Sequence, residues 1–117
     1  MPDQQATTSV TEFDIKAKRL ALQATLESIL GSKNVYFQPP YNINLSYPCI
    51  IYNRISGKSI KADNKVYNFY TQYEVKHITM DPDEFIFPEM QRNFSHCSYD
   101  RHFVADRLHH NVYTIYI

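Results

Sequence analysis

The chain has 117 residues, enough for a single domain (1–117) with one hydrophobic core, and its 12 basic and 12 acidic residues give zero formal net charge. A neutral domain has no overall electrostatic attraction for nucleic acid or for an anionic membrane. Because the chain contains only two glycines, Gly31 and Gly57, it lacks the glycine-rich motifs of dinucleotide-binding domains and P-loop enzymes.

The cysteines and the N-terminus indicate where the chain is made. Nothing in the polar stretch from Pro2 to Ser9 resembles a signal peptide, and no apolar run is long enough to span a bilayer. We therefore expect synthesis in a cytosol and no membrane contact. In that compartment Cys49 and Cys97 are expected to be reduced and buried rather than bridged.

A long helix is the first predicted element. Residues 1–9 are polar and are predicted to form a flexible N-terminus. The capping-box spacing of Ser9 and Glu12 then predicts a helix from about Thr11 to Leu30, with Gly31 as its C-terminal cap. An apolar stripe at helical spacing predicts that one side of the helix packs on a sheet; its members are Ile15, Leu22, Leu26, Ile29 and Leu30.

Three strands are predicted next. Asn34 to Gln38 reads as a short strand that Pro39 ends, and Cys49 to Ile55 as a central strand with apolar residues on both faces. Clear alternation from Val66 to about Met80 predicts a long, half-buried antiparallel strand. The polar connection from Gly57 to Asn64 is long for a hairpin loop, so we expect a long hairpin with a basic tip. The tip carries Lys58, Lys61 and Lys65.

The last third of the chain predicts a second helix and a terminal hairpin. Asp81 and Pro82 indicate a turn, followed by a short helix from about Pro88 to Asn93 that carries Met90 and Phe94 inward. Two runs rich in β-branched and aromatic residues then flank a polar corner of about four residues, which predicts a hairpin. The runs are 97–106 and 111–117.

This order of elements predicts an α+β fold. One mostly antiparallel β-sheet is packed by the N-terminal α-helix, and a second short helix precedes the C-terminal β-hairpin.

A polar cluster in the terminal hairpin is the main candidate site. Strand alternation places Tyr99, Arg101 and Phe103 on one face and Asp100 with His102 on the other. Buried polar groups without partners are costly, so contact with another subunit would explain the cluster; a solvent-exposed sheet face is the alternative. Ten tyrosines also favour an assembling protein, although tyrosine is common in strands. The candidate subunit-interface residues are Tyr99, Asp100, Arg101, His102, Lys58, Lys61 and Lys65.

An enzymatic alternative is a small metal-dependent nuclease. Asp63, Glu74 and Lys76 have the Asp…Glu-x-Lys spacing in which two carboxylates hold Mg²⁺ and a lysine helps to activate water. Glu-x-Lys is also common on solvated strand faces. The four histidines between His96 and His110 do not have the paired spacing of zinc ligands. We therefore expect no catalytic residue, metal or cofactor.

Several segments resemble a family of tailed-phage structural proteins, the tail terminator or tail completion proteins. The resemblance covers about Val35 to Ile117 and is carried by the segments 62–67, 73–75, 81–83, 97–106 and 110–114. It implies a virion protein, not an enzyme. The implied assembly is a ring, typically hexameric, that caps the head-proximal end of the tail tube. Its implied partners are the tube protein and the neck or head-completion proteins, with DNA only passing through the ring lumen.

Overall fold

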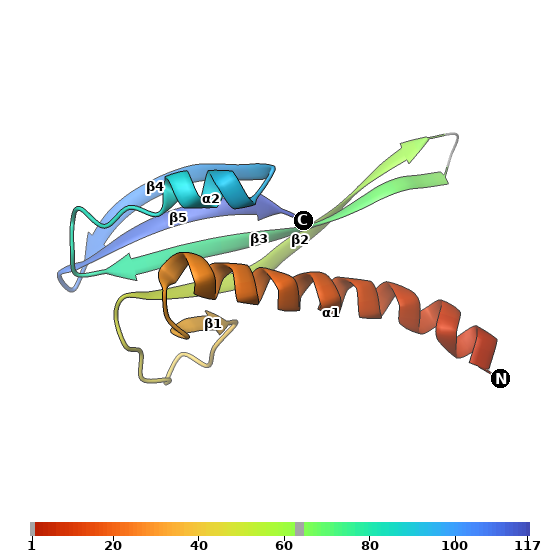
Figure 1. The fold of residues 1–117 in the computed structure, drawn as a ribbon, viewed down its shortest axis with the longest axis horizontal. Coiled ribbons are helices and arrows are strands. Elements are labelled where there is room, and N and C mark those ends of the chain that lie inside the picture. Colours follow the sequence, from red (N-terminus) through yellow and green to blue (C-terminus); the bar gives the residue numbers. More distant parts are fainter. Residues whose placement is uncertain (1, 63–64) are drawn as a thin grey trace.

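The computed structural model describes the backbone of residues 2–62 and 65–117, and the side chains of residues 15–55 and 70–117. Its two helices and five strands give the predicted α+β fold (Figure 1). In chain order the elements are α1 (Pro2–Leu30), β1 (Val35–Phe37), β2 (Cys49–Ala62), β3 (Lys65–Thr79), α2 (Phe87–Asn93), β4 (His96–Ala105) and β5 (Leu108–Tyr116).

The strands form one sheet in the order β1-β2-β3-β5-β4. β1 runs parallel to β2, and each of the other neighbouring pairs is antiparallel. The prediction of one mostly antiparallel sheet is therefore confirmed. The two edges differ greatly in length, since β1 has 3 residues and β4 has 10.

α1 is longer than predicted. It begins at Pro2, whereas we expected a flexible segment over residues 1–9 and a helix start near Thr11. Proline is favoured in the first helical turn, and no glycine or further proline follows it before Gly31. Gly31 ends the helix as predicted, with φ at +82° and its N–H donating to the Glu27 carbonyl at 2.8 Å. Among the described residues, neither helix is long and apolar enough to cross a membrane.

The connection between β2 and β3 is much shorter than predicted. We expected a strand ending near Ile55 and a long polar loop from Gly57 to Asn64. Instead β2 continues to Ala62, and β3 begins at Lys65. Register shifts occur between Arg54 and Ser56 and again near Ile60, and such bulges keep a strand paired where its alternation is irregular.

The far end of this hairpin is a two-stranded arm. β5 pairs with β3 only from Gln72 to Thr79, and the last backbone contact joins Thr71 to Ile117. Beyond that point, among the described residues, β2 and β3 pair only with each other. Figure 1 shows this arm reaching past β4 and β5, on the same side of the molecule as the N-terminal half of α1.

The terminal hairpin turns at a tighter corner than predicted. β4 ends at Ala105 and β5 begins at Leu108, so the corner is Asp106 and Arg107 alone rather than about four residues. Both residues have positive φ, 53° and 64°, as a type I′ turn requires. Asp106 is common in such a turn, but Arg107 replaces the glycine that usually follows, so the Asn-Gly or Asp-Gly signal of a two-residue loop is missing.

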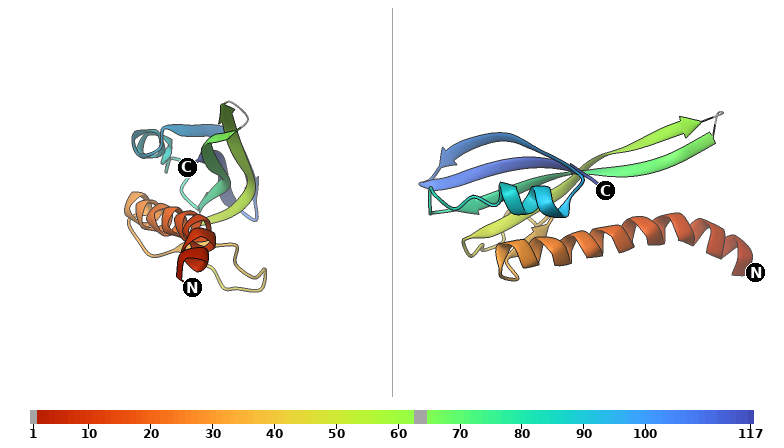
Figure 2. Two further views of the ribbon diagram at one scale, coloured as in Figure 1. Left: turned by 90° about the vertical axis from the view of Figure 1, so that its right-hand side faces the viewer. Right: turned by 45° about the horizontal axis from the view of Figure 1, so that its top comes forward.

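Both helices cover the same face of the sheet (Figure 2). Leu22 and Leu26 from α1 are 2% and 0% exposed, which confirms the predicted stripe. Ile29 is partly buried and packs against the same core. As predicted for the longest strand, Thr71, Tyr73 and Val75 are buried on one face. The remaining buried members of the core are Val35, Ile50, Tyr52, Ile86, Met90, Phe94, Tyr113 and Ile115.

α2 forms where the sequence predicted a short helix. It begins at Phe87 with Pro88 in its first turn, and Met90 is fully buried while Phe94 is 8% exposed. Both therefore point inward as predicted. The preceding residues form the predicted turn, in which the Asp83 N–H donates to the Asp81 carboxylate at 2.9 Å.

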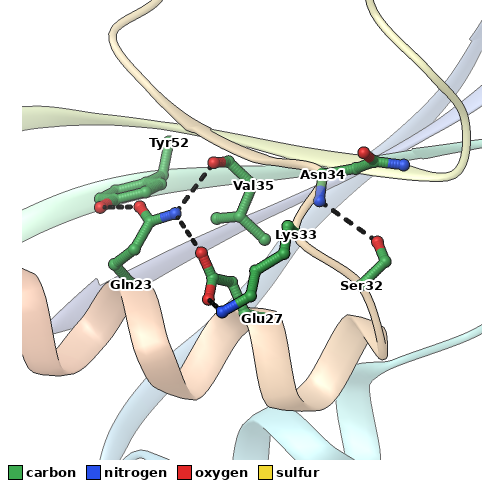
Figure 3. Close-up of polar contacts among 7 residues, drawn as sticks. All are labelled: Gln23, Glu27, Ser32, Lys33, Asn34, Val35 and Tyr52. Atoms are coloured by element: carbon green, nitrogen blue, oxygen red, sulfur yellow. Dashed lines mark hydrogen bonds and ion pairs between the residues drawn. The ribbon is translucent and has the colours of Figure 1, made fainter.

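Gln23 links α1 to two strands at the interface between the helix and the sheet (Figure 3). Its amide oxygen accepts a hydrogen bond from the Tyr52 hydroxyl at 2.6 Å, and its amide nitrogen donates to the Val35 carbonyl at 2.9 Å. The same nitrogen donates to Glu27, which also pairs with Lys33. One polar side chain thus joins the helix to both β1 and β2.

Candidate assembly interface

β4 is the most exposed strand among the described side chains. It pairs with β5 on one side, and none of the strands in the described part of the chain pairs with its outer edge. All of its residues are exposed except Cys97, which is half-buried. Exposed large apolar side chains accompany this edge: Tyr99, Phe103 and Val104 are 37%, 36% and 55% exposed. A long strand edge with accessible N–H and C=O groups is a template for pairing with another chain.

A β-bulge changes the predicted faces of β4. Tyr99 pairs with Tyr113 and Arg101 pairs with Val112, so Asp100 is an extra residue without its own partner. The insertion places Tyr99 and Arg101 on opposite faces, although simple alternation put them together. Asp100 and Arg101 now share a face, although alternation separated them. Simple alternation therefore placed Arg101 and His102 on the wrong faces relative to Tyr99 and Asp100, although the members of each pair do lie on opposite faces.

Asp100 and Arg101 lie on the sheet face that no helix covers. The Asp100 carboxylate accepts hydrogen bonds from Ser98 at 2.9 Å and from Thr114. The Arg101 guanidinium lies 5.8 Å from the centre of the Phe103 ring, which stacks on His110 at 4.5 Å. Arg101 is exposed and has no carboxylate partner among the described side chains. It remains available for an acceptor on another chain.

Tyr99 and His102 lie on the helix-covered face. The Tyr99 hydroxyl donates to the Asn111 side chain at 2.8 Å, and its ring packs 5.5 Å from Phe87 and 5.3 Å from Tyr113. His102 stacks on His109, with a ring nitrogen of each 3.0 Å apart. Both residues therefore have partners inside the subunit. The structure does not bring all four predicted residues of 99–102 together.

The three lysines of the predicted basic tip belong to the arm. Lys58 and Lys61 lie within β2, and Lys65 is the first residue of β3. Their side chains lie outside the described residues. The backbone alone shows that they are spread along a two-stranded ribbon and not gathered in a loop.

The structure describes two of the three proposed nuclease residues. Glu74 and Lys76 do share a strand face, and their charged groups lie 3.8 Å apart. Asp63 lies outside the described residues. Among the side chains that are described, no group of three or more His, Cys, Asp or Glu is placed to hold a metal ion.

Both cysteines are free thiols in buried or half-buried positions. Burial raises the pKa of Cys49 to about 11. Burial, assisted by the nearby Asp100 carboxylate, raises the pKa of Cys97 to about 11 as well. Both thiols are therefore protonated near neutral pH, and neither has the lowered pKa of a reactive cysteine.

Sequence reasoning missed a cleft between α1 and the sheet. It has a volume of about 380 Å³ and is lined by residues from four elements, among them Lys16, Arg19 and Arg54. Arg54 is far in the sequence from Lys16 and Arg19, so no local motif predicts that they line one cleft. The only signal was that Asn53 and Arg54 follow the apolar start of the predicted strand.

A buried histidine beside a glutamate was missed too. His77 is fully buried, and its Nε2 atom lies 3.6 Å from the Glu84 carboxylate. Neither ring nitrogen has a hydrogen-bond partner among the described residues. Burial lowers the pKa of His77 below its ordinary value, and the Glu84 carboxylate opposes this shift only in part. The ring is therefore neutral in the folded state near pH 7.

We expect His77 to make the fold less stable in mild acid. The unfolded chain binds a proton at His77 near pH 6.5, whereas the folded chain binds it only at lower pH. Stability is thus highest above pH 6.5 and falls as the pH decreases, by up to about 1.4 kcal/mol per pH unit for one proton. Urea unfolding between pH 7.5 and 5.5 measures this slope. His77→Gln should flatten it, and an unchanged slope would contradict the assignment.

The chain matches no protein-family model, no curated protein and no solved structure.

Proposed function

We propose that this chain is a structural virion protein of a tailed phage. In this proposal it forms a ring, typically a hexamer, that terminates the tail tube at its head-proximal end and joins it to the neck. The resemblance of residues 97–106 and 110–114 to tail terminator and tail completion proteins supports the proposal. The partners are the tube protein and the neck or head-completion proteins, and DNA passes through the ring without being a substrate.

The exposed edge of β4 is the observation that carries this proposal. Within the described chain, no strand pairs with the outer edge of this 10-residue strand, which also carries exposed aromatic side chains. Such an edge is a hazard in a monomer, because other strands can add to it. A defined neighbour that adds to the edge removes the hazard. The bulge at Asp100 and the charge of Arg101 then restrict which neighbour fits.

The β2–β3 arm, at the far end of the central hairpin (Figure 1), supports the same proposal. Two-stranded hairpins are at best marginally stable in water on their own. An arm of this kind gains stability by lying against another chain. A ring requires two different complementary surfaces on each subunit, and the β4 edge and the arm are two such surfaces.

The first test is the mass of the purified chain in solution. Native mass spectrometry should record one closed oligomer, alone or after addition of the tail-tube protein, and electron microscopy should show rings. A chain that stays monomeric in both conditions would contradict the proposal. Magnesium-dependent cleavage of DNA that is lost in Glu74→Ala would instead favour the nuclease alternative.

A substitution at Arg101 tests whether the β4 edge forms the subunit contact. Arg101→Ala should weaken each subunit contact by about 2 kcal/mol or more if that contact is desolvated, because arginine at an interface centre is a frequent hot spot. The ring should then fail to close while circular dichroism stays unchanged. Arg92→Ala, at an exposed arginine of α2 that pairs with Glu89, is the control and should assemble normally. Normal virions from Arg101→Ala would refute the role of this residue.

A further inference from the structure

The cleft beside α1 has the lining of an anion-binding site. Lys16 and Arg19 come from α1 and Arg54 from β2, while the rings of Phe37 and Tyr73 also line it. We call this set the basic cleft. Its volume of about 380 Å³ lies within the range of ligand pockets, enough for a few side chains of another chain.

Among the described side chains, the cations of the basic cleft have no counter-charge. None of the three pairs with a carboxylate among the described side chains, and the described residues that line the cleft include no acid. The Arg19 guanidinium lies 4.5 Å from the centre of the Phe37 ring. Burial raises the pKa of Tyr73, and the nearby charges of Arg54 and Arg19 oppose that shift. The charges of both guanidiniums are therefore felt at the same side chain of the cleft, Tyr73.

The chain also carries a surface of the opposite charge. The segment Met80–Phe85, which we call the acidic turn, follows β3. Asp81 and Asp83 are exposed there, between Met80 at 67% and Phe85 at 49% exposure. Two carboxylates flanked by apolar side chains match a cleft that combines three cations with two aromatic rings. Arginine binds carboxylates especially well because its planar group donates two parallel hydrogen bonds.

The acidic turn is held in one shape. The Asp81 N–H donates to Thr79 at 3.1 Å, the Asp83 N–H donates to Asp81 at 2.9 Å, and the Glu84 N–H donates to the Asp81 carbonyl at 3.2 Å. Glu84 itself turns inward to Thr79 and His77. A segment that is already ordered loses little conformational entropy when it binds.

We propose that the acidic turn of one copy of this chain binds in the basic cleft of a second copy. The two surfaces cannot meet within one chain, because Tyr73 in the cleft and Thr79 before the turn are six residues apart on β3, about 20 Å. Contacts between two different surfaces join subunits head to tail, as a ring requires. This inference rests on the self-assembly proposed above and identifies one of its contacts.

Charge reversal tests the contact. Arg54→Glu and Asp83→Lys each change an exposed residue, so circular dichroism should stay that of the original chain. Each should weaken self-association by about 30-fold or more, measured by light scattering across a concentration series. Lys16→Glu is a second cleft variant with the same expected direction. Arg92→Glu, on α2, is the matched control and should associate normally.

An equal mixture of the two variants gives the sharpest result. Mixed Arg54→Glu and Asp83→Lys chains should regain association, because every cleft then meets a turn of opposite charge. An equal mixture of Asp83→Lys with Arg92→Glu should show no association beyond that of the Arg92→Glu chains alone, because no cleft in it carries the charge that accepts the altered turn of Asp83→Lys. If the original chain assembles and all cleft and turn variants assemble equally well, this contact is refuted while the ring proposal stands. If the original chain does not assemble at all, both proposals fail.

Discussion

Replacing Leu26 with alanine should lower the free energy of unfolding by about 2–5 kcal/mol. Leu26 is 0% exposed, and it packs from α1 into the core between the helix and the sheet. Truncation removes buried methyl groups and leaves a cavity that rigid neighbouring strands cannot fill completely. Urea denaturation followed by circular dichroism measures the loss.

Leu20→Ala is the matched control for this substitution. Leu20 lies on the same helix but is 51% exposed, so the identical chemical change should cost no more than about 0.5 kcal/mol. Similar costs at the two positions would show that α1 does not pack on the sheet through the Leu26 stripe.

Replacing Gln23 with alanine should cost about 2–4 kcal/mol, which is unusual for a polar helix residue. The change deprives the Tyr52 hydroxyl of its acceptor and the Val35 carbonyl of a donor. Tyr52 is fully buried, so its hydroxyl cannot turn to water instead. A buried polar group that loses its partner costs about 1–3 kcal/mol.

A double-mutant cycle separates the hydrogen bond from general packing. Tyr52→Phe removes the hydroxyl itself and should cost less than Gln23→Ala. The free energy of unfolding is also measured for Gln23→Leu alone and for Gln23→Leu combined with Tyr52→Phe. The double variant should lose clearly less stability than Gln23→Leu and Tyr52→Phe lose in sum, because no unpaired hydroxyl remains in it. Strictly additive costs would contradict a direct link between Gln23 and Tyr52.

The elements with a strong periodic signal were predictable. The apolar stripe of α1 and the alternation in β3 reflect burial of one face, and burial is what hydrophobic patterns record. Met90 and Phe94 were placed correctly for the same reason. The start of α1 and the extension of β2 to Ala62 were missed because polar residues form helix or strand there without such a pattern.

The candidate site was harder to predict. A bulge leaves no signal in the residue types, so alternation continued through Asp100 and placed Arg101 and His102 on the wrong faces. The basic cleft joins α1 to β2 across more than thirty positions, from Arg19 to Arg54, and only the fold brings these cations together. Local spacing carries no information about such a contact.

The bulge in β4 also bears on the solubility of the free subunit. An uninterrupted 10-residue edge would pair with almost any exposed strand, and that is how many proteins aggregate. The extra residue at Asp100 breaks the regular ladder of hydrogen bonds into two short runs. An unrelated strand then finds no continuous partner, while a neighbour with a matching irregularity does. Deleting Asp100 would restore an even edge, and with it a surface on which newly made chains precipitate before they assemble.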